Sequence, residues 1–158
     1  MRFIAHRANV NGPSNLENLP SQVDWCLEQS IDCEVDLWVV NGVYSLGHDS
    51  GQYQVTREWL LKRQQRLWIH CKNPEALKSL RDVNEKGLNY FWHEEDSYTL
   101  TSLNWIWVYP GMPVIPGSVS VLPEKWLTDS RGEEISLSYG ICTDYFFQFR
   151  RRFHDVDT

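Results

Sequence analysis

Four short strand-like segments of the chain each end in ionisable side chains. The segments read FIAHR, DCEVDLWVV, VYSLGHD and RLWIHCKN, and the ionisable residues are His6, Glu34, Asp36, His48 and Lys72. Apolar, β-branched and aromatic residues fill the rest of each segment, as in buried β-strands. Parallel α/β sheets and (β/α) barrels place their chemistry at the carboxyl ends of the strands. The pattern therefore predicts an α/β fold with a single site at that end of the sheet.

The order of strand-like and helix-like segments predicts a barrel. Eight segments are rich in Trp, Tyr, Phe, Val and Ile and are bounded by Gly, Pro, Asn or Asp. They are residues 2–7, 33–40, 43–48, 67–71, 88–93, 104–109, 118–122 and 138–143. Helices are expected over residues 19–29, 56–64 and 74–85, the second capped by Thr56 and the third by Asn73. We therefore expect a compact (β/α)8 TIM-type barrel, with an open α/β sheet as the structural alternative.

The chain is short for such a barrel. It has 158 residues, against about 250 in a typical one. The connections after residue 93 leave no room for full helices, so several outer helices should be shortened or missing. The outer face of the fifth to seventh strands should then be exposed, or be covered by a second copy of the chain in a homo-oligomer. The closing segment FFQFRRRF is expected to form a helix with a basic outer face.

Composition excludes several classes of protein. The length fits one domain, residues 1–158. A net charge of −6 argues against general nucleic-acid binding. No apolar stretch reaches membrane-spanning length, and the N-terminal segment lacks the long apolar core of a signal peptide. The four cysteines form no CxxC pair, so we expect buried thiols in a reducing compartment. A cytoplasmic protein without stable membrane insertion is the expectation.

Glu34 and Asp36 are candidate metal ligands. They are two residues apart in a strand-like segment, so their side chains should share one face of the sheet. Two carboxylates on one inward face repel each other unless a cation lies between them, and oxygen ligands suit hard divalent ions. The alternative is a solvent-exposed strand with alternating residues. Ile31, Leu37 and Trp38 favour a buried strand and therefore a metal site.

Histidines and cations at neighbouring strand ends indicate acid–base chemistry on an anion. His6 and His48 end two of the predicted strands, and imidazole titrates close to neutral pH. Arg7 and Lys72 could hold an anionic oxygen, as in a phosphate ester, and Asp49 could orient His48. The alternative is a set of structural histidines and salt bridges.

Five residues of the later segments are further candidates for the same cavity: His93, Glu94, Trp107, Tyr109 and Glu124. For Trp107 and Tyr109 the alternative is packing in the core. His93 and Glu124 end the fifth and seventh predicted strands. For His93 the alternative is a solvated loop, because the sequence WHEED is also typical of one.

The order of the motifs resembles the glycerophosphodiester phosphodiesterase family, one of the phosphatidylinositol-specific phospholipase C-like barrels. The motifs are HR, GPSNLEN, the ExD of CEVDL, GHD, a strand ending in Lys72, and GICTDY. The resemblance covers residues 1–73 and 140–145, so the chain would be a shortened and divergent member. It implies a (β/α)8 barrel that hydrolyses small-molecule phosphodiesters with a divalent metal, Mg²⁺, Ca²⁺ or Mn²⁺.

The resemblance also assigns roles to individual residues. The acid–base pair would be His6 and His48. The metal would be held by Glu34 and Asp36. The phosphate would contact Arg7 and Lys72, and Glu17 would support the site.

Three departures from the family pattern bear on function. Ala8 replaces the glycine that usually follows HR, and the shortened second half removes loops that would contact the alcohol. His70 stands where a third acidic metal ligand is expected, which favours Mn²⁺, Zn²⁺ or Fe²⁺ over Ca²⁺ or Mg²⁺. Alternatively, no metal binds and His70 acts directly on the phosphate. The rival functions are a non-catalytic barrel that binds a phosphate or sugar phosphate, and an enzyme for another phosphodiester.

Overall fold

The computed structural model describes residues 1–82 and 87–154. Its strands form one sheet: β1 (Arg2–Ala5), β2 (Asp32–Val40), β3 (Val43–Leu46), β4 (Tyr53–Val55), β5 (Leu67–Cys71), β6 (Asn89–Phe91), β7 (Tyr98–Leu100), β8 (Ile106–Val108), β9 (Val119–Val121) and β10 (Gly140–Thr143). The α-helices are α1 (Pro20–Glu28), α2 (Arg57–Arg63), α3 (Pro74–Asp82), α4 (Gly132–Ser136) and α5 (Phe146–His154). Three short 3₁₀ segments are η1 (His6–Ala8), η2 (Pro123–Lys125) and η3 (Asp129–Arg131).

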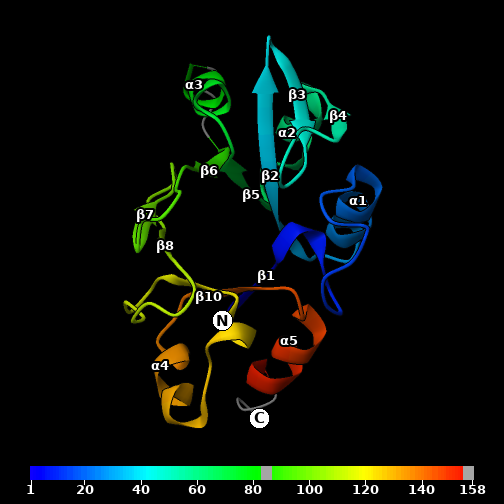
Figure 1. The fold of residues 1–158 in the computed structure, drawn as a ribbon. Helices are drawn as coiled ribbons and strands as arrows, with labels where there is room; N and C mark the ends of the chain where they lie inside the picture. The colour runs from blue at the N-terminus through cyan, green and yellow to red at the C-terminus, as the bar shows by residue number, and fades with distance from the viewer. Residues whose placement is uncertain (83–86, 155–158) are drawn as a thin grey trace.

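The parallel strands curl into a ring. Their order is β6, β5, β2, β1, β10, β9, β8, and every neighbouring pair in that order is parallel. Figure 1 shows these strands around a central space, with α1, α3 and α5 outside them. Within the described ranges no ladder joins β6 to β8; instead the Ser102 N–H donates to the Tyr90 carbonyl across this gap. The expected α/β sheet is therefore confirmed as a curled sheet, without full hydrogen-bonded closure.

One predicted barrel strand is a hairpin instead. The segment 43–48 contains β3, which pairs antiparallel with β2, and β4 extends the hairpin. Only Asn41 and Gly42 separate β2 from β3, and both have positive φ, 51° and 77°. A two-residue turn of this kind joins antiparallel strands, whereas a parallel pair needs a long crossover. The ring thus has one strand fewer than the predicted eight, and the Asn-Gly pair is the reason.

The helices begin where their capping residues predict. Thr56 Oγ1 accepts a hydrogen bond from the Trp59 N–H, and Asn73 Oδ1 accepts one from the Ala76 N–H. The predicted end of the third helix, Glu85, lies outside the described residues. The last helix, α5, exposes its arginines as predicted.

The outer helices are reduced on one side of the ring. The described chain between β6 and η2 contains no helix, as expected from the short connections. Tyr98, Leu100 and Leu103 are exposed there. Cover by a second copy of the chain remains a prediction.

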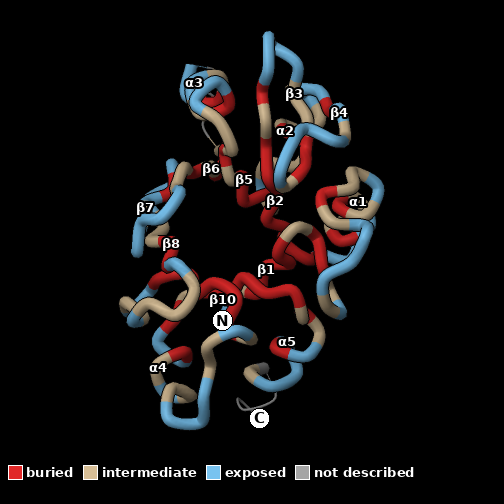
Figure 2. The backbone as a smooth tube through the Cα atoms, in the orientation of Figure 1, coloured by how far each residue is buried: buried red, intermediate tan, exposed pale blue. Residues whose placement is uncertain are grey.

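The core has two parts, one on each face of the sheet. Val35, Leu37 and Ile69 pack outward against the helices, whereas Trp68 and Trp107 fill the inside of the ring. Figure 2 shows that buried residues lie mainly along the ring and exposed residues at the periphery. Because side chains alternate along a strand, β2 directs Glu34 and Asp36 inward when its apolar residues face the helices. All four cysteines are free and buried, as predicted.

None of the helices in the described ranges has the length and apolar character needed to span a bilayer.

Candidate active site

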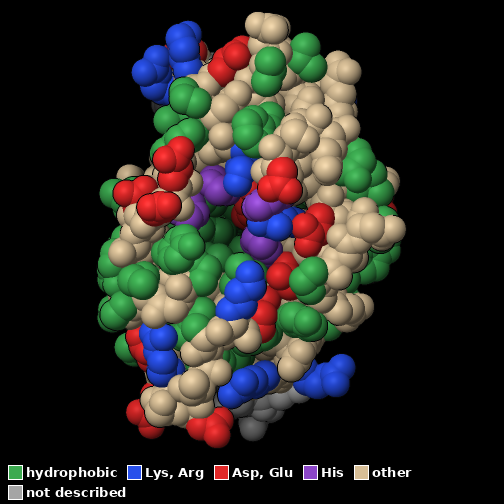
Figure 3. Space-filling view, in the orientation of Figure 1, with side chains coloured by type: hydrophobic (Ala, Val, Ile, Leu, Met, Phe, Trp, Pro, Cys, Tyr) green, Lys and Arg blue, Asp and Glu red, His purple; other side chains and the backbone are tan. Residues whose placement is uncertain are grey.

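A cavity of about 460 Å³ opens at the carboxyl ends of the parallel strands. Figure 3 shows a hollow in this face, with histidine, acidic and basic side chains around its mouth. Most of the predicted site residues line it: His6, Arg7, Glu34, Asp36, His48, His70, Lys72 and His93. The rule that strand ends gather functional groups therefore located the cavity.

Asp36 is the most heavily paired group of the cavity. The residue is 1% exposed. Asn18 Nδ2 donates to Asp36 Oδ2 (3.0 Å), and Asn18 Oδ1 accepts from the backbone N–H of Asp36 (2.9 Å). Arg7 Nε lies 3.1 Å from Oδ2, and His70 Nδ1 and Lys72 Nζ lie 3.1 and 3.5 Å from Oδ1. Burial opposes the charged form, but these partners lower the pKa of Asp36 far below its ordinary value. Asp36 is therefore a charged carboxylate in a shell of donors.

Glu34 is in the opposite electrostatic situation. It is 2% exposed, and its Oε2 accepts a hydrogen bond from the backbone N–H of Arg7 at 3.0 Å. Burial and the charge of Asp36 raise its pKa above the ordinary value. The exposed-strand alternative for these two acids is wrong, since both carboxylates point into the ring.

The turn after β1 places Arg7 over both acids. Arg7 and Ala8 have positive φ, 51° and 62°, a region that non-glycine residues rarely adopt. Ala8 thus takes a conformation that is more usual for glycine. Arg7 also forms an ion pair with Glu17 (NH1 to Oε2, 3.3 Å), so Glu17 lies next to Arg7. Strained backbone of this kind persists where surrounding contacts fix it.

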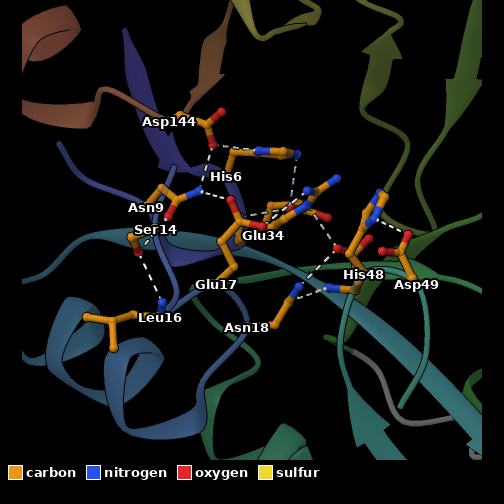
Figure 4. A network of polar contacts seen from close by, with 12 residues as sticks. His6, Asn9, Ser14, Leu16, Glu17, Asn18, Glu34, His48, Asp49 and Asp144 are labelled. Carbon is orange, nitrogen blue, oxygen red and sulfur yellow. Dashed lines mark hydrogen bonds and ion pairs between the residues drawn. The ribbon is translucent and has the colours of Figure 1, made fainter. Parts of the chain in front are cut away.

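His6 is held by an acid that the sequence analysis did not select. Its Nδ1 lies 2.8 Å from Asp144 Oδ1, and its Nε2 lies 3.9 Å from Glu34 Oε2 (Figure 4). Asn9 Nδ2 donates to the same Asp144 oxygen (2.8 Å) and to Glu17 (2.9 Å). Burial opposes protonation, but the bond to Asp144 and the charge of Glu34 raise the pKa of His6.

His48 lies at the rim of the cavity. Its Nδ1 is 2.6 Å from Asp49 Oδ1, so the two side chains are in contact. The two residues follow β3, which ends at Leu46. Because they lie in a turn, adjacent side chains can meet, which they could not do on a strand. His48 is half-exposed and can change its contacts at little cost.

His70 and His93 form a second imidazole pair inside the cavity. Their rings stack with centroids 4.9 Å apart. His70 Nε2 lies 3.1 Å from the His93 carbonyl, which can only accept, so this nitrogen donates. Burial, with the charges of His70 and Lys72, lowers the pKa of His93 to about 4. His93 therefore belongs to the cavity and is neutral near pH 7.

Three side chains have the donor atoms and spacing for a metal ion. One ligand atom from each of Glu34, Asp36 and His70 lies within 4.8 Å of the others. His70 Nδ1 faces the acids while Nε2 bonds a carbonyl, the arrangement usual for a ligating histidine. Two carboxylates and one imidazole suit Mn²⁺ or Zn²⁺ as well as Mg²⁺. The donor set therefore fits a divalent cation.

The side chain of Glu124 does not lie where the sequence predicted. It does not line the cavity; its carboxylate accepts bonds from Thr143 Oγ1 and from the Asp144 backbone N–H, both at 2.8 Å. Glu124 thus fixes the end of β10 and, through it, Asp144. Asp144 itself could have been found, because it follows the last strand directly.

Comparison with known proteins gives limited information. No protein-family model and no curated protein matches the chain. A solved structure of a "putative glycerophosphodiester phosphodiesterase" from Galdieria sulphuraria is similar to it, with 14% identity over 96% of each chain and a TM-score of 0.47. That name is the family whose motif order the sequence resembles. Because the identity and the TM-score are both low, we infer function from the cavity residues and not from this match.

Proposed function

We propose that the protein hydrolyses small-molecule phosphodiesters, with His6 and His48 as the acid–base pair. The observation that carries the proposal is the His6–Asp144 pair, whose imidazole lines one cavity with two cations and two buried acids. An imidazole oriented by a carboxylate is a common general acid or base. A glycerophosphodiester-like substrate fits the family that the motifs resemble.

The proposed roles follow from the placement of each group. Arg7 and Lys72 would neutralise the non-bridging phosphate oxygens, the main source of catalysis in phosphoryl transfer. One imidazole would take the proton from the attacking hydroxyl, either of water or of the substrate's neighbouring alcohol. The other would protonate the leaving oxygen. Nε2 of His6 would carry the proton, because Nδ1 is engaged by Asp144, and Nε2 faces Glu34 Oε2 at 3.9 Å.

A divalent cation is part of the proposal. Glu34, Asp36 and His70 would hold it, and when bound it would supply positive charge next to the phosphate. Asn18 would keep the Asp36 carboxylate in place.

The test is a panel of phosphodiesters assayed with purified protein, with and without Mn²⁺, after metal analysis. Release of alcohol that depends on the metal and is lost in His6→Ala and in His48→Ala is the expected result. Asp24→Ala is a control, because Asp24 pairs with Arg63 away from the cavity. Turnover that persists in His6→Ala would contradict the proposed mechanism.

One observation favours a second candidate, a non-catalytic barrel that binds phosphate or a sugar phosphate. Arg7 and Lys72 already neutralise Asp36, so the site is charge-compensated by protein groups alone. Tight binding of inorganic phosphate with no turnover on the panel would select this candidate.

A further inference from the structure

The cavity has two chemically different walls. Residues 6–72 supply most of its ionisable groups, from His6 to Lys72, and the others are His93, Glu94 and Lys125. Residues 91–125 supply mainly rings and aliphatic groups, among them Phe91, Trp107, Tyr109, Val121 and Leu122. The proposed chemistry uses only the first wall.

The floor of the second wall is a fixed aromatic surface. The rings of Phe91 and Trp107 have centroids 4.5 Å apart, and Trp68 packs on Trp107 from below at 5.8 Å. Trp107 is 3% exposed. Because the rings are held by the core of the barrel, a ligand meets them already in position, without an ordering cost.

Tyr109 extends this surface to the mouth of the cavity. It is 41% exposed, and its ring meets that of His93 edge to face at 5.8 Å. An apolar group entering the cavity would displace water mainly from the ring of Tyr109, because Phe91 and Trp107 are 2% and 3% exposed. Such burial favours apolar ligands.

We propose that the cavity selects phosphodiesters in which one ester group is aromatic or otherwise apolar. That group lies on the wall of Phe91, Trp107 and Tyr109, while the phosphate lies at Arg7 and Lys72. The inference rests on the proposed phosphodiesterase function for its turnover assay, and on the cavity alone for its binding assay.

The turnover test compares the methyl, glyceryl and benzyl esters of glycerol 3-phosphate. Methanol and benzyl alcohol are leaving groups of similar acidity, so a difference reports binding to the wall. The benzyl ester should have a kcat/KM about tenfold or more above the other two, since its ring buries apolar surface. Equal values, or a preference for the glyceryl ester, would overturn the inference and leave the phosphodiesterase function intact.

A matched pair of variants locates the effect. Tyr109→Ala should reduce the ratio of benzyl to methyl kcat/KM. Tyr98→Ala should leave that ratio unchanged, because Tyr98 is exposed to a similar extent, 38%, but does not line the cavity. A ratio that is the same in both variants and the wild type would remove Tyr109 from the wall and contradict the inference.

A binding assay separates the two proposals. If none of the esters is hydrolysed, the phosphodiesterase function fails, and calorimetry then compares benzyl phosphate with methyl phosphate. Benzyl phosphate with a Kd at least tenfold lower supports the apolar wall. Equal Kd values overturn it.

Discussion

Asp144 Oδ1 and His6 Nδ1 form a 2.8 Å hydrogen bond that joins the end of β10 to the end of β1. The two strands are neighbours in the sheet, although the residues are 138 positions apart in the sequence. The bond fixes which nitrogen of His6 faces the cavity. The orientation of the proposed catalytic imidazole thus depends on the last strand of the ring.

Asp144→Asn should lower kcat by about 10²–10⁴-fold, because an amide can hold the wrong tautomer of His6. Steady-state kinetics on any hydrolysed phosphodiester measure this. Asp129→Asn, at an exposed position in η3, is the control. Wild-type kcat in Asp144→Asn would show that this bond has no part in the chemistry.

His48→Ala should separate activity from stability. Because His48 is half-exposed and its recorded partner is the exposed Asp49, the free energy of unfolding should change by no more than about 0.5 kcal/mol. Turnover should fall by about 10²–10⁴-fold if His48 is the second acid–base group. Urea titration and kinetics on the same preparation test both statements, and a folded variant with full turnover excludes His48.

The two acids of β2 should respond differently to neutralisation in metal-free protein. Asp36→Asn leaves Arg7 and Lys72 without their carboxylate and should cost about 3–5 kcal/mol of unfolding free energy. Glu34→Gln should cost much less, because burial and Asp36 already disfavour its charge.

The pH dependence of the same pair has a definite sign. The pKa of Glu34 is raised in the fold above 4.5, so stability from this group is present at low pH and is lost as the pH rises through the folded value. The free energy of unfolding of Glu34→Gln should therefore rise relative to that of the wild type between pH 4 and pH 7, roughly the span from the unfolded pKa to neutrality. Urea titrations in EDTA at several pH values measure this, and parallel curves would contradict it.

His70→Asp should change the metal preference. Replacing the imidazole by a third carboxylate should weaken binding of Mn²⁺ and Zn²⁺ relative to Mg²⁺ and Ca²⁺, by about tenfold or more in the ratio of Kd values. Calorimetric titration of the apo protein gives these values directly. His93→Gln should leave the ratio unchanged, because His93 is outside the ligand cluster. An unchanged ratio in His70→Asp would mean that His70 is not a ligand.

Asn73→Ala should destabilise the fold more than an ordinary cap mutation. Asn73 caps α3 and also bonds the Val39 N–H and carbonyl, at 3.2 and 2.7 Å. Loss of the cap and of the bonds to β2 should cost about 2–4 kcal/mol, against about 1 kcal/mol for the cap-only mutation Thr56→Ala. Equal urea midpoints for Asn73→Ala and Thr56→Ala would show that the bonds from Asn73 to β2 contribute nothing to stability.

Much of the site follows from simple periodicity. Glu34 and Asp36 were predictable because alternation puts them on one face of β2, and the strand-end rule places His6, Lys72 and His93 beside them. The same rule, applied to β10, would have identified Asp144. Asn18 was harder to find, because it reaches Asp36 from a loop at a positive φ of 59°.

The main error in the predicted fold came from reading composition without the turn. The segment 43–48 has strand composition, but Asn41 and Gly42 just before it restrict the connection to a hairpin. Composition therefore predicted the strand and could not predict its direction. The unclosed side between β6 and β8 depends on loop contacts such as that of Ser102, which no periodic pattern encodes.

The division of the cavity wall along the chain has a consequence for engineering. Because residues 6–72 supply most of the ionisable groups and residues 91–125 the aromatic rings, the second segment could be exchanged or randomised while the first stays constant. A library built this way would search for new ligand preferences while the reaction centre is unchanged. Helix α3 lies between the two segments in the sequence and is a suitable crossover point.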